Sequence, residues 1–344
     1  MRIGKLPIGK YNAIVDVPGV KVGHVTLSSG AVQTGVTAVL PHSRNLFKEK
    51  VPAAAHVING FGKTVGIVQI EELGQIETPI ILTNTLSVGR CSEALVEYAL
   101  KQNPEIGRTT GTVNPVVAEC NDGYLNDIRG LYVSKEHVWQ AIAQADDSWS
   151  TEKEGAVGAG TGMSCYGLKG GIGSASRVIK IDNEEYVVGI LALTNFGRLE
   201  DLIVNGKRVG PAIQSQIKQK DSPPDQGSVI AVLATNLPVS DRQLGRMARR
   251  VSAGLARTGT YIGHGSGDIV LAFSTANLIP HEFSQAVRKI NIIDDGALEG
   301  SFQAVVEGSE ESVLKSMIRA KSVTGRDGHH RYSLQEFLDL IEER

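Results

Sequence analysis

The junction of Gly227 and Ser228 is the part of this sequence that most clearly indicates catalytic chemistry. Residues 214–226 are polar, with Ile217 as their only large apolar side chain, and they indicate an exposed loop or linker. Residues 229–234 then form the continuous apolar run of a buried strand. Gly-Ser pairs elsewhere in the chain lack this combination, and we interpret them as turns.

A serine in this position can become an N-terminal nucleophile. If Ser228 attacks the carbonyl of Gly227 and the bond between them breaks, the serine gains a free α-amine beside its hydroxyl. An α-amine has a pKa of about 7.7–8.0, so part of it is neutral near pH 7 and acts as a base. Nucleophile and base then belong to one residue, as in N-terminal serine and threonine enzymes. We therefore predict self-cleavage into residues 1–227 and 228–344.

A second polar group occupies residues 263–268, directly before the apolar run 269–273. Ser266 and Asp268 are two positions apart, so in an extended strand their side chains share a face. A hydroxyl and a carboxylate on one face can hold an ammonium group through charge-assisted hydrogen bonds. The alternative is a polar strand start after a turn, and the spacing alone leaves both open.

Two further residues carry donors that suit a developing oxyanion. Asn195 follows the apolar run 187–193, and Tyr124 lies within residues 121–127, which have the composition of a turn. Each also has a structural interpretation, the asparagine as a strand cap and the tyrosine as a half-buried ring.

Three other signals are interpreted as structural. Residues 60–64 contain Gly-Lys-Thr, but a phosphate-binding loop needs a glycine where Val57 stands. His329 and His330 have no further ligand at metal-site spacing, so we expect an exposed turn and no metal. Cys120 is interpreted as a small buried side chain.

Strands and helices must position these residues. Strands are predicted for runs rich in valine and isoleucine, at residues 12–17, 35–40, 80–82, 186–193, 228–234 and 268–273. Ser240 and Gln243 have the spacing of a capping box that begins a helix, and further helices are predicted over 309–320 and from 333. Several strands follow one another directly, which favours a mixed α/β sandwich over a parallel doubly wound sheet. We interpret the 344 residues as a single α/β domain.

The composition limits the kinds of binding partner and the cellular compartment that we expect. The formal net charge of −2 gives no reason to expect nucleic acid or an anionic membrane as partner. The three cysteines are an odd number at wide spacing, which argues against a disulfide framework or a zinc site. Neither a signal peptide nor a membrane-spanning apolar run is found, so we expect the cytoplasm. We expect no metal or organic cofactor.

Short motifs along the chain together resemble the L-aminopeptidase/D-Ala-esterase and β-aminopeptidase family of self-processing hydrolases. The motifs occupy residues 12–20, 22–24, 34–38, 83–85, 122–127, 160–163, 169–173, 249–250, 256–259, 266–268 and 324–328. Each motif alone is weak, and their combination is specific. The resemblance implies a four-layer α/β/β/α sandwich, similar to other N-terminal nucleophile hydrolases but differently connected. We also expect a homo-oligomer.

The resemblance assigns roles to the candidate residues. Ser228 corresponds to the family's nucleophile and new N-terminus, and Ser266 and Asp268 correspond to the pair that supports its amine. Tyr124 and Asn195 correspond to the oxyanion groups. Some relatives carry glutamate at the position of Asp268, so the shorter aspartate must reach the same amine.

The predicted function is that of a serine aminopeptidase that releases small N-terminal residues from peptides, amides or esters, with Glu119 as a contact for the substrate ammonium. One rival is an acyltransferase resembling ornithine acetyltransferase, which shares the self-cleaving architecture but uses threonine where this chain has Ser228. A second rival is a binding protein that keeps the fold without cleavage. The joint presence of all the site residues argues against it.

Overall fold

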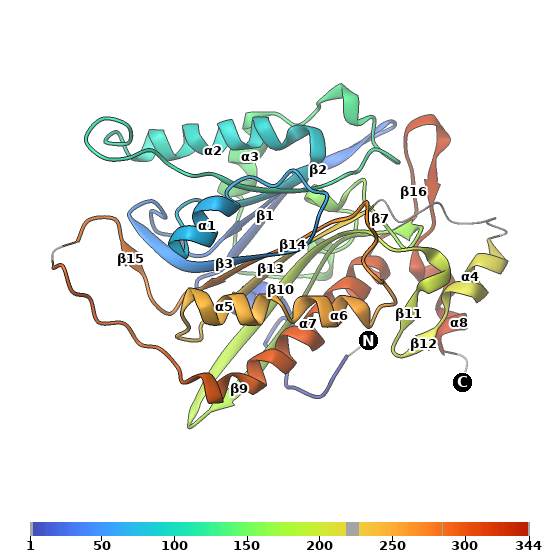
Figure 1. Ribbon diagram of the computed structural model, residues 1–344. Helices are drawn as coiled ribbons and strands as arrows, with labels where there is room; N and C mark the ends of the chain where they lie inside the picture. The colour runs from blue at the N-terminus through green and yellow to red at the C-terminus, as the bar shows by residue number, and fades with distance from the viewer. Residues whose placement is uncertain (1–2, 218–226, 284, 343–344) are drawn as a thin grey trace.

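Two β-sheets stack face to face, and helices cover the outer face of each (Figure 1). The computed structural model describes residues 3–217, 227–283 and 285–342. The layers follow the order helix, sheet, sheet, helix, so the predicted four-layer α/β/β/α sandwich is confirmed. Most of residues 214–226, predicted as an exposed linker, lies outside the described residues; the short helix α4 (Gly210–Gln216) ends just before this gap.

The larger sheet contains the strand that begins at Ser228. Its order is β15-β3-β14-β13-β10-β9, and β4 pairs with β3. These strands are β3 (Glu49–Gly60), β4 (Gln75–Ile76), β9 (Gly171–Ile181), β10 (Glu184–Asn195), β13 (Ser228–Thr235), β14 (Gly267–Ser274) and β15 (Ile279–Pro280). Strand β13 runs antiparallel to β10 and parallel to β14. The part of the chain after residue 227 thus supplies two inner strands of this sheet.

The smaller sheet has the order β1-β2-β5-β6. Its strands are β1 (Lys21–Ser29), β2 (Val32–Leu40), β5 (Ile80–Asn84) and β6 (Val116–Cys120). Helices α2 (Val88–Gln102) and α3 (Lys135–Ala143) cover it, whereas α5 (Asp241–Ala248), α6 (Val251–Ala256) and α7 (Glu299–Ile318) cover the larger sheet. The shorter elements are α1 (Ile67–Leu73), α8 (Leu338–Glu342), β7 (Ser164–Cys165), β8 (Leu168–Lys169), β11 (Ile203–Val204), β12 (Lys207–Arg208), β16 (Val323–Thr324) and β17 (His330–Arg331).

The alternation of side chains along β13 separates two hydrophobic cores. One set of side chains packs between the two sheets and the other packs against α5, α6 and α7. The inter-sheet set is Ile230, Val232 and Ala234, and the helix-facing set is Val229, Ala231 and Leu233. Because both faces of β13 are buried, its sequence is a continuous apolar run rather than an alternating one.

The predicted elements agree with the structure except in three places. Residues 12–17 were expected as a strand and this is wrong: the 3₁₀ turn Ile14–Asp16 forms instead, because the Asp16 carboxylate accepts the amides of Tyr11 and Ala13. The helix that begins after Ser240 divides into α5 and α6. Helix α7 begins ten residues earlier than predicted.

None of the helices in the described ranges is long and apolar enough to cross a membrane.

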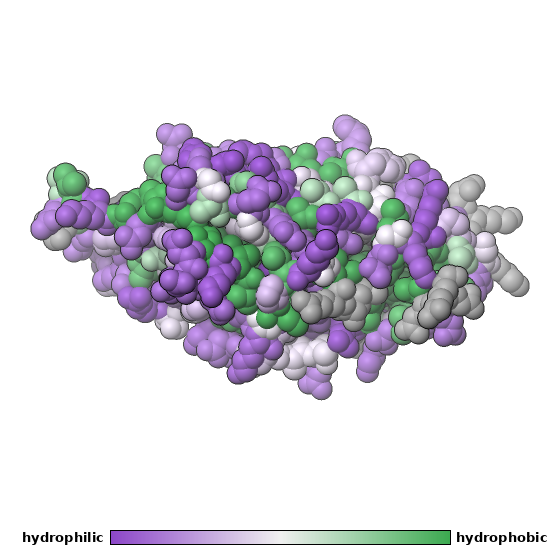
Figure 2. Space-filling view, turned by 90° about the horizontal axis from the view of Figure 1, so that it is seen from below, coloured by the Kyte–Doolittle hydropathy of each residue, from purple (hydrophilic) through white to green (hydrophobic). Residues whose placement is uncertain are grey.

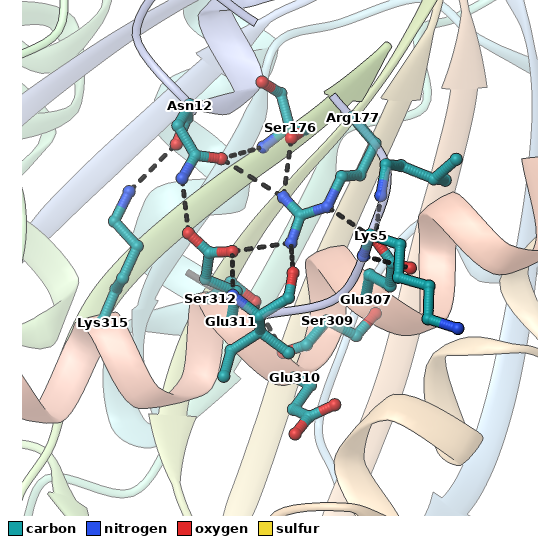
Figure 3. Close-up of polar contacts among 12 residues, drawn as sticks. Lys5, Asn12, Ser176, Arg177, Glu307, Ser309, Glu310, Glu311, Ser312 and Lys315 are labelled. Atoms are coloured by element: carbon teal, nitrogen blue, oxygen red, sulfur yellow. Dashed lines mark hydrogen bonds and ion pairs between the residues drawn. The ribbon is translucent and has the colours of Figure 1, made fainter. Parts of the chain in front are cut away.

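A buried ionic network ties the N-terminal segment to β9 and α7 (Figure 3). Arg177 has no exposed surface, and its guanidinium lies 3.0 Å from Glu307 Oε2 and 2.6 Å from Glu311 Oε2. Asn12 donates to Glu311, and the amide of Lys5 donates to Glu307 at 3.0 Å. The network fixes helix α7 against the larger sheet, beneath the strands that carry the candidate site.

Candidate active site

Three adjacent inner strands of the larger sheet bring four candidate residues together where the strands begin or end. Asn195, the last residue of β10, pairs with Ser228, the first residue of β13. Ser228 pairs in turn with Gly267, the first residue of β14. Ser266 and Asp268 flank Gly267, so four residues that are far apart in the sequence meet at the strand ends.

Gly227 occupies a position where only glycine fits. A Cβ atom there would lie 2.1 Å from the carbonyl oxygen of Asn195, far inside van der Waals contact. The carbonyl oxygen of Gly227 accepts a hydrogen bond from the amide of Gly267 at 3.2 Å. This bond holds and polarises the carbonyl that self-cleavage would attack.

The Ser228 hydroxyl is buried, and its Oγ makes no hydrogen bond within the described part of the chain. Cys120, at the end of β6, lies beside it from the smaller sheet. Burial raises the pKa of the Cys120 thiol well above its usual range, although the neighbouring serine side chain acts in the opposite direction. The thiol is therefore neutral, as expected for a small buried side chain, and the serine is the group available for attack.

Asp268 and Ser266 meet as their spacing predicts. Ser266 Oγ donates to Asp268 Oδ1 at 2.6 Å, and both residues are almost fully buried. The same carboxylate oxygen accepts the backbone amide of Val229 at 3.1 Å. The aspartate therefore reaches the backbone one residue beyond Ser228 despite its shorter side chain.

The amide of Asn195 has a fixed orientation. Its Oδ1 accepts the backbone N–H of Ser164 at 2.9 Å, so the oxygen end is occupied and the Nδ2 end is the donor available to the site. Ser164 Oγ in turn accepts Nε of Arg331 at 3.1 Å. The first residue of β7 therefore fixes the orientation that the suggested donor role of Asn195 requires.

Tyr124 lies between two side chains from the hairpin of β16 and β17. Its ring stacks on His329, with centroids 4.5 Å apart, and the Arg331 guanidinium lies 3.5 Å from its centroid on a cation–π contact. Burial lowers the pKa of Arg331, and Tyr124 opposes that shift. Arg331 contacts both Tyr124 and Ser164, so it connects Tyr124 to Asn195. The described residues contain no cluster of three metal-binding side chains.

Glu119 is buried next to Cys120 at the end of β6. Its Oε1 accepts the amide of Lys63 at 3.0 Å, and its Oε2 accepts the Thr85 hydroxyl. Asp122, an acid two residues after Cys120, has no exposed surface, and burial raises its pKa to about 7. Glu119 is therefore the better placed of the two acids.

Sequence reasoning missed the residues that support the site. Arg331, His329 and Ser164 act through contacts with Tyr124 and Asn195 that no local spacing reveals. Lys63 belongs to the Gly-Lys-Thr segment that was set aside as a false nucleotide signal. Ser164 and His329 directly follow the motifs at residues 160–163 and 324–328, but Lys63 and Arg331 adjoin no motif of the resemblance, so only the fold reveals their contacts with the site residues.

Comparisons with known proteins show the family and the fold to which this chain is similar. The family described as peptidase family S58 matches residues 12–331. The β-peptidyl aminopeptidase BapA of Sphingosinicella microcystinivorans is 37% identical over 93% of this chain and 85% of its own length. A crystal structure of a Pyrococcus horikoshii protein matches with a TM-score of 0.92 and 50% identity, over 99% of this chain and 96% of that one.

The description of a third similar protein includes its fold. The L-aminopeptidase D-Ala-esterase/amidase of Ochrobactrum anthropi, described as a variant of the N-terminal nucleophile hydrolase fold, matches with a TM-score of 0.88 and 34% identity, over 98% of this chain and 97% of that one. The fold thus defines a hydrolase of the N-terminal nucleophile class. The chain belongs to peptidase family S58 and is an aminopeptidase, a hydrolase that acts on peptide bonds. The comparisons do not favour the acyltransferase alternative.

Proposed function

We propose that this aminopeptidase cleaves itself between Gly227 and Ser228 and then uses Ser228 as an N-terminal nucleophile. The observation that carries the proposal is the placement of Ser228 at the start of a buried strand, opposite Asn195 and beside Asp268. After cleavage, residues 1–227 and 228–344 would stay associated as one α/β domain, because β13 and β14 lie between β10 and β3 in the same sheet.

In the proposed reaction, Ser228 Oγ attacks the carbonyl carbon of an aminoacyl amide or ester. The α-amine of the same residue takes the hydroxyl proton and passes it to the leaving amine or alcohol. Asn195 Nδ2 and the Tyr124 hydroxyl stabilise the oxyanion, and water then hydrolyses the serine ester. Asp268 and Ser266 hold the α-ammonium by charge-assisted hydrogen bonds, which is consistent with the 3.1 Å contact to the adjacent amide of Val229.

The substrates we propose are short peptides, aminoacyl amides or esters with a small unblocked N-terminal residue. Glu119 supplies the negative charge for the substrate ammonium. The relatives carry names that refer to β-peptides, L-amino acids and D-alanine esters, so an unblocked amine is the feature these substrates share. No metal or organic cofactor enters the proposed reaction.

A comparison of blocked and unblocked substrates tests this assignment. The enzyme should release the chromophore from alanine and β-alanine anilides, and N-acetylation of the substrate should abolish release because it removes the charge that Glu119 receives. Addition of glutamate as acceptor should leave the rate unchanged. Acetyl transfer from N-acetylornithine to glutamate, without anilide hydrolysis, would contradict the proposal.

We also propose that the protein is a homo-oligomer in the cytoplasm. Residues 281–283 and 285–292, which follow β15, project from the body at the left of Figures 1 and 2, and several of their large apolar side chains are exposed. These are Phe283, Val287, Ile290 and Ile292. Cys91 and Cys120 are free and buried, in keeping with a reducing compartment. Light scattering should give the wild type a molar mass that is a multiple of 36.7 kDa, and Val287→Asp should lower that mass. A monomeric wild type would contradict the proposed oligomer.

A further inference from the structure

The segment 60–64, which cannot be a phosphate loop, lies across the candidate site. The amide of Phe61 donates to the carbonyl of Ser266 at 3.2 Å, and the amide of Lys63 donates to Glu119 Oε1 at 3.0 Å. Between them, Gly62 packs so tightly on Gly267 that a Cβ atom on Gly267 would lie 2.8 Å from Gly62 Cα. The segment therefore runs from the Ser266 side of the site to the Glu119 side.

The side chain of Lys63 stands at the rim of this site without an acidic partner. Its ammonium donates to the carbonyl of Phe61 at 3.1 Å and lies 4.5 Å from the centroid of the Phe61 ring. No carboxylate in residues 3–217, 227–283 or 285–342 lies within 4.0 Å of Lys63 Nζ. Lys63 and Phe61 are both exposed, and Phe61 retains 59% of its surface. A cation and an aromatic ring thus face solvent together near the start of β14, where Gly267 pairs with Ser228.

The positions of the two charges fit a dipeptide. The backbone amide of Lys63 contacts the carboxylate of Glu119, whereas its side chain turns back toward the carbonyl of Phe61, which leaves the ammonium at most about 6 Å from the Lys63 Cα. The two residues of a dipeptide span at most about 7 Å. An ammonium bound at Glu119 and a carboxylate bound at Lys63 would therefore be separated by about the length of one dipeptide, with the scissile carbonyl between them.

We propose that Lys63 binds the free α-carboxylate of the leaving amino acid and that the Phe61 ring packs against its side chain. The enzyme would then favour dipeptides and other short peptides whose carboxylate reaches Lys63, over amides of the same sequence. The inference rests on the proposed function, because it needs Ser228 as nucleophile and Glu119 as the contact for the substrate ammonium. It adds a specificity-determining residue on the opposite side of the scissile bond.

Lys63→Met tests the proposal because it keeps most of the side-chain length and removes the charge. Alanyl-phenylalanine and alanyl-phenylalaninamide form a matched pair of substrates that differ in the carboxylate. For the free dipeptide, Lys63→Met should raise KM about fivefold with little change in kcat, and Lys63→Arg should restore it. For the amide, KM should change less than twofold. Equal changes for both substrates, or no change for either, would overturn the proposal.

The control variant is Lys10→Met, because Lys10 is also exposed and lies 4.5 Å over the ring of Tyr11, a residue outside the strands that carry the site. It should leave both KM values unchanged. Calorimetric binding of a reduced-amide analogue of the dipeptide, with and without its carboxylate, gives the same comparison without turnover. If the wild type binds the carboxylate form better than Lys63→Met does but neither hydrolyses substrate, the proposed function fails while the carboxylate site stands. If binding is indifferent to Lys63, the carboxylate site fails.

Discussion

Ser228 and Asn195 face each other in the final register position that β10 and β13 share. A single antiparallel pairing therefore places the proposed nucleophile opposite the proposed oxyanion donor. The register is fixed by the burial of both faces of β13, because a slip of one residue would exchange the side chains of the two cores. The geometry of the proposed reaction would thus be a consequence of how the strands of this sheet pair.

Asn195→Ala should lower kcat by about 10²–10³, the usual effect of losing one oxyanion donor, with a small change in KM. Steady-state assays on processed protein measure this. Asn236→Ala is a matched control, because Asn236 also accepts a backbone amide, that of Val187 at 2.7 Å, but lies at the opposite end of β13. Equal activity losses in the two variants would remove Asn195 from the site.

Asp268→Asn should lower turnover by about two orders of magnitude or more, because the α-ammonium of Ser228 loses its counter-charge. The thermal midpoint should change little, since an amide oxygen can still accept from Ser266 and Val229. Asp294→Asn serves as control, because Asp294 accepts the amide of Gly296 at an exposed helix start. Normal turnover of Asp268→Asn on processed protein would show that the carboxylate has no part in the reaction.

Asp122 makes stability depend on pH in an unusual direction. Burial raises its pKa from 3.8 to about 7, so between these values the folded protein keeps a proton that the unfolded chain has released. Stability from this group therefore falls as pH rises through that window. Asparagine cannot ionise. The free energy of unfolding of Asp122→Asn should therefore exceed that of wild type by about 2 kcal/mol at pH 5 and by about 4 kcal/mol at pH 8.

Urea unfolding at these two pH values, in a Ser228→Ala background that keeps the chain intact, measures that difference. A constant difference between the two proteins would show that Asp122 does not titrate in this range.

Arg177→Met should destabilise the protein by about 3–5 kcal/mol, because Glu307 and Glu311 would remain buried without their cation. Arg44→Met, which breaks a pair with Glu49 where the arginine side chain is 62% exposed, should cost less than about 1 kcal/mol. Thermal unfolding of both variants supplies the comparison. Similar midpoints for the two would mean that the network in Figure 3 contributes no more than a surface pair.

The sequence predicts the strands of the larger sheet because their apolar runs are continuous and end at polar residues. Strand β13 is found almost to the residue, since Gly227 and Ser228 mark an abrupt change in polarity. Helix α7 is found only in its second half, because it is buried on most sides and carries Glu307, Glu310 and Glu311 among its buried residues. A helix stabilised by buried ion pairs has no clear apolar stripe.

In the site too, residues that are close in the sequence are predicted, whereas contacts between distant segments are not. Ser266 and Asp268 are predicted together because a strand places residues i and i+2 on one face. The supporting contacts of Arg331 with Tyr124 and of Lys63 with Glu119 join segments more than fifty residues apart. Such contacts depend on how the two sheets stack, and no local pattern encodes them.

The most direct test of self-processing is the intact mass of purified protein together with its N-terminal sequence. Wild type should yield two associated chains, residues 1–227 and 228–344, and the second should begin at Ser228. Ser228→Ala should remain a single chain, because the attacking hydroxyl is absent. A wild-type chain that hydrolyses aminoacyl anilides while staying at full length, or a Ser228→Ala chain that still divides at residue 227, would contradict the account.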